Sequence, residues 1–419
     1  MSKTLKTWTT LGVAAVAAAA SAHATMPIQT HEPMSAAGYI LVEGEGGEGS
    51  EGGEGGGSAV TIYALNSSNA NAFDFDAKPQ IEAYANHVHK TYRTAKEQAE
   101  ALAAAIDSLL DTPTAESLAA ARTAWVQARP AYLRSEAFRF YDGPIENIEG
   151  EINAWPMNEA HIDYVEGKPD AGIVNSPSIT LSANQLKDIN QKSDDADVTT
   201  GWHAIEFLLW GQDLSATGPG NRPAKDYIAG TGNNDRRRTY LKVVVEKLVA
   251  DLQALESSWA PGKADNYRVT FEGLEQREAL GRMINGMAIL AGFEFMSERL
   301  SVALDSGDQE DEHSCFSDTT KQDFVYDLEG ISHVWTQTQI DELVRSRDAA
   351  LADKVSAFLT DAENKIAKLA DPWDSVLATP KGSPERQNAE RVVESLQALA
   401  NGLKEVGTKL GVLVIIPSG

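Results

Sequence analysis

A histidine and a glutamate lie three residues apart in the segment GWHAIEFLLWGQD, residues 201–213. On a helix, His203 and Glu206 leave the same face almost one turn apart, so they can bind one metal ion or share one proton. Their neighbours are mostly apolar, which predicts a buried helix. Because a buried carboxylate needs a metal, a cation or several hydrogen-bond donors, two interpretations stay open. One is a metal site, and the other is a His–Glu hydrogen bond within a core helix.

A second group of potential ligands lies in the stretch DSGDQEDEHSCFSDTT, residues 305–320. Its acidic residues precede His313, and oxygen donors with an imidazole suit iron, manganese, zinc or calcium. The spacing matches no EF-hand loop. The alternative is a solvated acidic loop on an acidic protein. As a metal ligand, His313 would be the third candidate, 107 residues after Glu206.

Carboxylates also occur on two apolar helical faces. The face that carries Met283, Met287 and Leu290 continues at helical spacing to Glu294 and Glu298, which predicts that both acids enter the core.

A similar face runs from Trp125 through Arg129 and Tyr132 to Glu136 and Arg139. Glu136 and Glu294 are therefore candidate metal ligands. The alternative is pairing with arginine, which is the usual cation of partly buried ion pairs.

The elements that would position these residues are almost all helices. Apolar residues recur at helical spacing over 81–110, from Pro113 to Tyr132, over 241–259, and over 280–304, 340–369 and 385–410. Strand-like alternation is scarce. The pattern predicts an all-α bundle architecture with irregular connections at 143–180, 211–235 and 305–320.

The N-terminal residues indicate export. Lys3 and Lys6 precede an apolar run from Leu11 to Ala20 and the small-residue pattern Ala22-His23-Ala24, which is typical of a secretory signal peptide. No cysteine lies near this cleavage pattern, so we expect no lipid anchor, and no later run is long enough for a transmembrane helix. The expected location is the periplasm or the cell envelope.

Composition excludes several classes of protein. The chain has 36 basic and 61 acidic residues, so a nucleic-acid partner is not expected and cations are the natural ligands. Cys315 is the single cysteine, which excludes an internal disulfide and a cysteine-based zinc site. The predicted organisation is a signal peptide at 1–24, a Gly/Glu-rich disordered tether at 25–58, one helical domain at 59–235 that carries His203, and a second at 236–419.

Four blocks of sequence together resemble the imelysin family, and within it the iron-regulated protein A group. They are residues 124–156 (AWVQARPAYLRSEAFRFYDGPIENIEGEINAWP), residues 201–213, residues 222–227 (RPAKDY) and residues 303–320 (ALDSGDQEDEHSCFSDTT). The GxHxxE signature of the family is present as Gly201, His203 and Glu206. The resemblance implies two packed helical-bundle domains, a cell-envelope location, expression linked to iron and a metal site at the HxxE motif.

Three functions are compatible with these residues. The favoured one is binding of iron, or of another divalent metal, in iron uptake or homeostasis, with ligands among His203, Glu206, Glu136, Glu294 and His313 and with an envelope iron-transport partner. A related HxxE motif in a periplasmic component of an iron transporter supports it. The second is a zinc metallopeptidase of the insulin-cleaving imelysin type, for which no catalytic residue is assigned. The third is a metal-free structural or interaction protein of the envelope.

Overall fold

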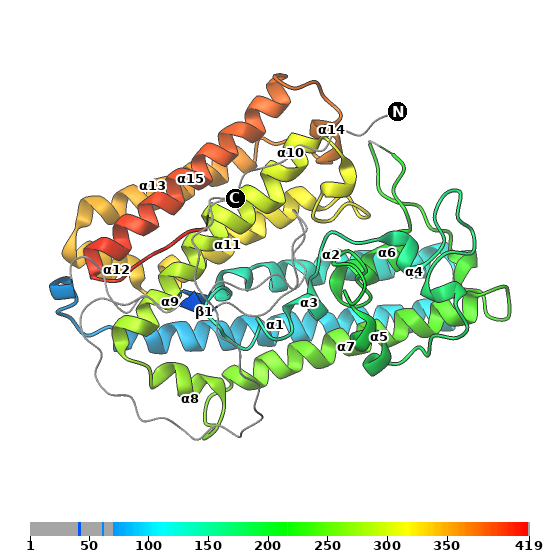
Figure 1. The fold of residues 1–419 in the computed structure, drawn as a ribbon, viewed down its shortest axis with the longest axis horizontal. Coiled ribbons are helices and arrows are strands. Elements are labelled where there is room, and N and C mark those ends of the chain that lie inside the picture. Colours follow the sequence, from blue (N-terminus) through cyan, green and yellow to red (C-terminus); the bar gives the residue numbers. More distant parts are fainter. Residues whose placement is uncertain (1–40, 43–60, 63–69, 216, 418–419) are drawn as a thin grey trace, which may run out of the picture. The chain divides into compact units, whose positions relative to one another are not determined.

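The computed structural model describes residues 41–42, 61–62, 70–215 and 217–417 of the 419-residue chain. The predicted signal peptide lies outside the described residues, as does the predicted tether apart from Leu41 and Val42. The fold is all-α, as the sequence predicts, and Figure 1 shows the arrangement of the helices.

Three long helices form one group: α1 (Lys78–Asp111), α2 (Ala115–Leu133) and α7 (Asn234–Trp259). Pro79 stands in the first turn of α1, where its missing N–H costs nothing. Thr114 caps α2 through its side chain, in a capping box with Ser117. Both α2 and α7 pack along α1 (Figure 1). The predicted domain boundary at residue 235 falls in the first turn of α7, and this boundary stays a prediction.

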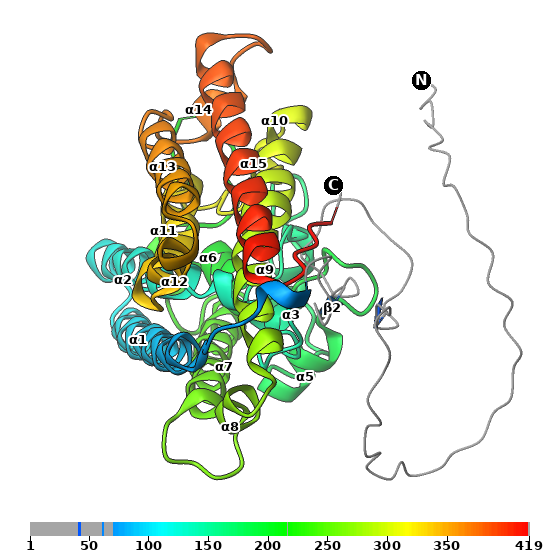
Figure 2. The same cartoon turned by 90° about the vertical axis from the view of Figure 1, so that its left-hand side faces the viewer.

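A second group contains the C-terminal helices. Its members are α9 (Gln276–Ile289), the π-helix η5 (Leu290–Ser301), α10 (Val302–Ser306), α11 (Thr320–Gln337), α12 (Ile340–Arg347), α13 (Ala349–Ile366) and α15 (Pro384–Leu410). The helix α15 packs against α13, η5 and α9, and α11 contacts α2 of the first group. Both views show α13 and α15 on the side opposite α1 and α7 (Figures 1 and 2).

Short elements connect the long helices. The described residues contain the strands β1 (Leu41–Val42) and β2 (Thr61–Ile62), which pair antiparallel, and the helices η1 (Ala70–Ala72), η2 (Glu136–Phe138), α3 (Glu149–Ile152), α4 (Glu159–Ile162), η3 (Ile173–Asn175), α5 (Ala183–Ile189), α6 (Gly201–Trp210), η4 (Ala224–Tyr227), α8 (Tyr267–Glu272), η6 (Gln309–Asp311) and α14 (Asp374–Leu377). None of the described helices is both long enough and apolar enough to cross a bilayer.

The structure corrects one predicted helical face. Glu294 is buried as expected, but Glu298 is only half-buried and Arg299 enters the core in its place. The reason is that residues 290–301 form a π-helix, which has more residues per turn than the α-helix assumed for the sequence pattern. Glu294 therefore meets Arg299, five residues later, with 3.3 Å between Oε1 and Nη2.

Candidate functional site

The helix α6 carries the HxxE motif through the interior of the protein. All ten of its residues are buried, and it packs against α2 and α7. Its first residue, Gly201, has φ of +86°, and a Cβ at this position would lie 2.3 Å from the carbonyl oxygen of Ile152. The glycine of the motif is therefore required by backbone conformation and by close packing.

His203 and Glu206 contact each other within α6, as their spacing predicts. Nδ1 of His203 lies 2.9 Å from Oε2 of Glu206. The other oxygen of Glu206, Oε1, accepts hydrogen bonds from the backbone N–H and the hydroxyl of Ser317, at 2.9 and 2.6 Å. Burial raises the pKa of Glu206 to about 8, although Ser317 and the charge of Arg129 act in the opposite direction.

The loop before α11 adds a second histidine–carboxylate pair. Nδ1 of His313 lies 2.7 Å from Oδ2 of Asp323, which also accepts a 2.6 Å hydrogen bond from the hydroxyl of Ser314. Burial acts to raise the pKa of Asp323, but Arg129 and His313 outweigh it and hold that pKa below its usual value. The structure thus places His313 next to His203, with 5.0 Å between the ring centroids.

Arg129 of α2 connects the two histidines. Its Nη2 lies 3.3 Å from Nε2 of His203, 3.5 Å from Nε2 of His313 and 3.8 Å from Oδ2 of Asp323. Its Nη1 donates to the side-chain oxygen of Asn153 at 2.5 Å. A guanidinium only donates hydrogen bonds, so the two Nε2 atoms act as acceptors and the Nδ1 atoms carry the protons. Both Nε2 atoms therefore point at one guanidinium group.

We call the group Arg129, His203, Glu206, His313 and Asp323 the histidine site. Its side chains are 0–2 % exposed. A histidine whose Nδ1–H is held by a carboxylate is oriented as metal-binding histidines usually are. In this arrangement the two carboxylates orient the rings, and the guanidinium of Arg129 lies where both Nε2 atoms point.

The structure places Glu136 and Glu294 in a second cluster, with arginines. Oε2 of Glu136 accepts from Arg139 at 2.7 Å and from Arg299 at 2.5 Å. Arg299 also donates to Oδ2 of Asp327 at 2.8 Å and contacts Glu294. These contacts correspond to the arginine-pairing alternative for both glutamates. The cluster lies one turn of α11 away from the histidine site, because Asp327 follows Asp323 by four residues.

Sequence reasoning did not assign Asn153, Ser317 or Asp323 to the site. Each is distant in sequence from the HxxE motif, and no local pattern marks it. The sequence pattern places Arg129 on the Trp125 face of its helix and predicts no contact with the histidines. The one indication in the sequence that Arg129 pairs with a buried acid is its place on a predicted buried face, because other predicted buried faces carry acids.

Several buried carboxyl groups predict an unusual pH dependence of stability. Burial raises the pKa of Glu159 to about 8, of Glu206 to about 8 and of Asp327 to about 7, above ordinary values of 4.5, 4.5 and 3.8. The folded state therefore binds protons more tightly than the unfolded state, and stability falls as pH rises from about 4 to 8. Burial lowers the pKa of His87 to about 4, which opposes this trend only below about pH 6.5.

We expect the metal-free protein to be more stable at pH 6 than at pH 8, by at least about 2 kcal/mol, since one pKa unit corresponds to about 1.4 kcal/mol. Urea unfolding followed by circular dichroism, in the presence of a chelator at both pH values, measures the difference. Equal or greater stability at pH 8 would contradict the expectation.

The histidine site and the helical groups around it define an all-α protein with a buried polar centre between helices. Residues 88–401 match the family model described as imelysin, so the chain belongs to the imelysin family. Iron-regulated protein A of Synechococcus elongatus is 20 % identical over 308 residues, which cover 70 % of this chain and 75 % of that protein.

Two solved structures share the fold. One is of a protein named as an iron-regulated protein A precursor, from Parabacteroides distasonis, with a TM-score of 0.64 and 15 % identity over 84 % of this chain and 98 % of that one. The other is of an imelysin-like protein from Psychrobacter arcticum, with a TM-score of 0.61 and 16 % identity over 82 % of this chain and 99 % of that one. The predicted resemblance to imelysins and to iron-regulated protein A is confirmed.

Proposed function

We propose that this protein is exported to the cell envelope and binds iron at the histidine site, as part of iron uptake or homeostasis. The observation that carries the proposal is the convergence of two Nε2 atoms on one cationic position, with each Nδ1 held by a carboxylate. Imidazole nitrogens and carboxylate oxygens suit iron. Two of the similar proteins are named iron-regulated protein A, which also favours a role connected with iron.

His203 and His313 would supply the nitrogen ligands. Glu206 and Asp323 would orient them and contribute negative charge, and Arg129 would give up its position between the rings. Glu136 and Glu294 are not needed for this role, because Arg139 and Arg299 accompany them.

Peptide hydrolysis fits the geometry less well. A zinc peptidase needs a metal position that water and a peptide can reach. The side chains of the histidine site are at most 2 % exposed, so a peptide has no access to them in this conformation.

The test is a titration of the metal-free protein with ferrous, ferric and zinc ions. We expect one iron per chain in the wild type and at least about a tenfold loss of affinity in His203→Ala and in His313→Ala, because each removes one nitrogen ligand. His89→Ala is the matched control, since His89 is paired with Glu256 outside the histidine site. Circular dichroism verifies that each variant is folded.

The outcomes separate the three functions. Unchanged iron affinity in both His203→Ala and His313→Ala would refute the proposal. Zinc-dependent cleavage of a peptide, abolished by a chelator and by the same substitutions, would establish the peptidase instead. Absence of metal binding in the wild type would leave a structural or interaction role.

A further inference from the structure

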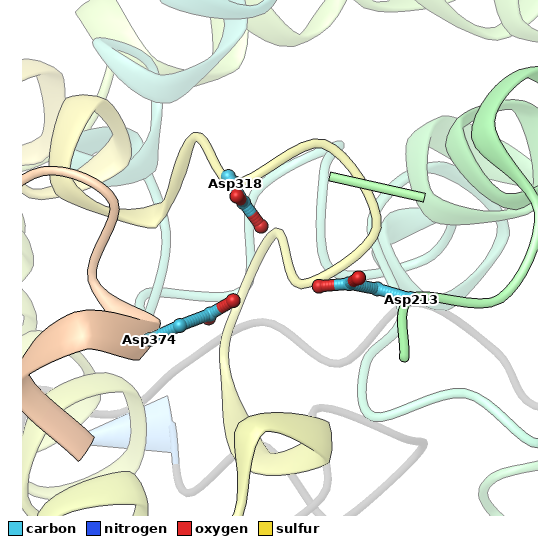
Figure 3. A group of neighbouring side chains, drawn as sticks. All are labelled: Asp213, Asp318 and Asp374. Atoms are coloured by element: carbon cyan, nitrogen blue, oxygen red, sulfur yellow. The ribbon is translucent and has the colours of Figure 1, made fainter. Parts of the chain in front are cut away.

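Three aspartates from separate segments direct their carboxylates at one another (Figure 3). Asp213 follows α6, Asp318 lies in the loop before α11, and Asp374 begins α14. One oxygen from each lies within 4.8 Å of the others. The three residues are buried, with exposed fractions of 3 %, 8 % and 2 % respectively.

A fourth carboxylate, of Glu312, belongs to the same place. Glu312 is fully buried, and neither of its side-chain oxygens has a hydrogen-bond partner. Burial raises its pKa, and so do the neighbouring carboxyl groups of Asp374 and Asp318, so Glu312 adjoins these two aspartates. Both carboxylate oxygens of Asp318 and of Asp374 also lack hydrogen-bond partners.

The charge of this acidic cluster (Asp213, Glu312, Asp318 and Asp374) is not balanced by a basic residue. Within residues 70–215 and 217–417, no lysine, arginine or histidine forms an ion pair with any of the four. Burial and repulsion from its neighbours raise the pKa of Asp318 to about 8, and burial raises that of Asp213 to about 6. Unpaired buried carboxylates are costly, so the cluster must retain protons or bind a cation.

We propose that the acidic cluster is a binding site for a hard divalent cation, and that calcium is the ion that fits best. The donors are all carboxylate oxygens, which hard cations prefer over nitrogen or sulfur. Calcium binds oxygens at about 2.3–2.6 Å, so two ligands on opposite sides of the ion are up to about 5 Å apart. The aspartate oxygens, which lie within 4.8 Å of one another, fall inside this limit. Magnesium needs about 2.1 Å and an octahedron, and therefore a tighter cluster.

A surface cavity reaches one member of the acidic cluster. Gln212, Asp213 and Leu214 line a surface cavity of about 480 Å³, so Asp213 belongs both to that cavity and to the acidic cluster. Once bound, the ion would join the end of α6, the loop before α11 and the start of α14. The site is separate from the histidine site, whose ligands include imidazole nitrogens.

The test is calorimetric titration of the chelator-treated full chain with Ca²⁺ and with Mg²⁺, together with thermal unfolding in each ion. We expect one Ca²⁺ per chain, weaker binding of Mg²⁺ and a higher midpoint of unfolding with Ca²⁺. Asp374→Asn and, independently, Asp318→Asn should weaken Ca²⁺ binding at least about tenfold, because affinity follows the number of charged ligands. Asp305→Asn is the matched control, since Asp305 is an exposed acid of the same region.

Three results would count against the proposal. Absence of Ca²⁺ binding to the wild type at millimolar concentration would overturn it, as would unchanged affinity in both cluster variants. Tighter binding of Mg²⁺ than of Ca²⁺ would overturn the assignment to calcium. His203→Ala should bind Ca²⁺ as the wild type does, which separates this site from the proposed iron site.

Discussion

Replacement of Gly201 by alanine is expected to destabilise the protein by about 3 kcal/mol or more, the sum of a left-handed backbone penalty and steric overlap. Gly201 has φ of +86°, and the new Cβ would lie 2.3 Å from the carbonyl oxygen of Ile152 and 2.6 Å from its carbonyl carbon. Backbone atoms cannot move aside as the end of a side chain can, so α6 or α3 must shift. Chemical denaturation followed by circular dichroism measures the loss.

Gly230→Ala provides the matched control for this prediction. Gly230 has φ of +74°, but a Cβ there meets nothing within 4 Å. Its substitution should cost only the backbone penalty of about 1–2 kcal/mol. Equal losses in the two variants would show that the contact with Ile152 is unimportant. If Gly201→Ala remains folded, displacement of α6 should also weaken the proposed iron binding at His203.

The second large effect is expected for Asp163→Asn, which should lower the free energy of unfolding by about 3–5 kcal/mol. Asp163 is fully buried and accepts hydrogen bonds from Arg222 at 2.8 Å and from Arg237 at 2.6 and 3.0 Å. These two arginines are at most 4 % exposed. The amide has the shape of the carboxylate but no charge, so it would leave two buried guanidinium groups without this counterion.

Glu405→Gln is the control for the buried ion pairs. Glu405 pairs with Lys354 at 2.8 Å, but both side chains are about half exposed. Its loss should change stability by less than about 1 kcal/mol. A comparable effect of the two substitutions would mean that burial does not determine the importance of these ion pairs.

Local patterns in the sequence predicted most of the helices and one contact of the site. The 3.6-residue period predicted α1, α2, α7 and α15, and the spacing of His203 and Glu206 predicted that these two side chains lie together. The predicted run over 340–369 is divided at Asp348, which ends α12 and caps α13 through its side chain. The helix over Thr320–Gln337 is not among the predicted elements, although Phe324, Leu328, Ile331 and Trp335 recur at helical spacing.

Non-local contacts could not be predicted from such patterns. The histidine site combines residues from α2, α6 and α11, and helical periods do not reveal which helices meet. The acidic loop is recognisable as a source of ligands, but the sequence does not reveal that its Asp318 meets Asp213 and Asp374 from distant segments. The π-helix could not be predicted either, because the spacing of Glu294 and Glu298 fits an ordinary α-helix.

The loop from Glu312 to Thr319 supplies side chains both to the acidic cluster and to the histidine site. Glu312 and Asp318 belong to the acidic cluster, whereas His313 and Ser317 contact or form the histidine site. If both proposed ions bind, their equilibria are linked through this one loop, and the linkage must be reciprocal. Any factor by which calcium changes the affinity for iron is the same factor by which iron changes the affinity for calcium. The concentration of free calcium would then influence the iron concentration at which this protein becomes half-saturated.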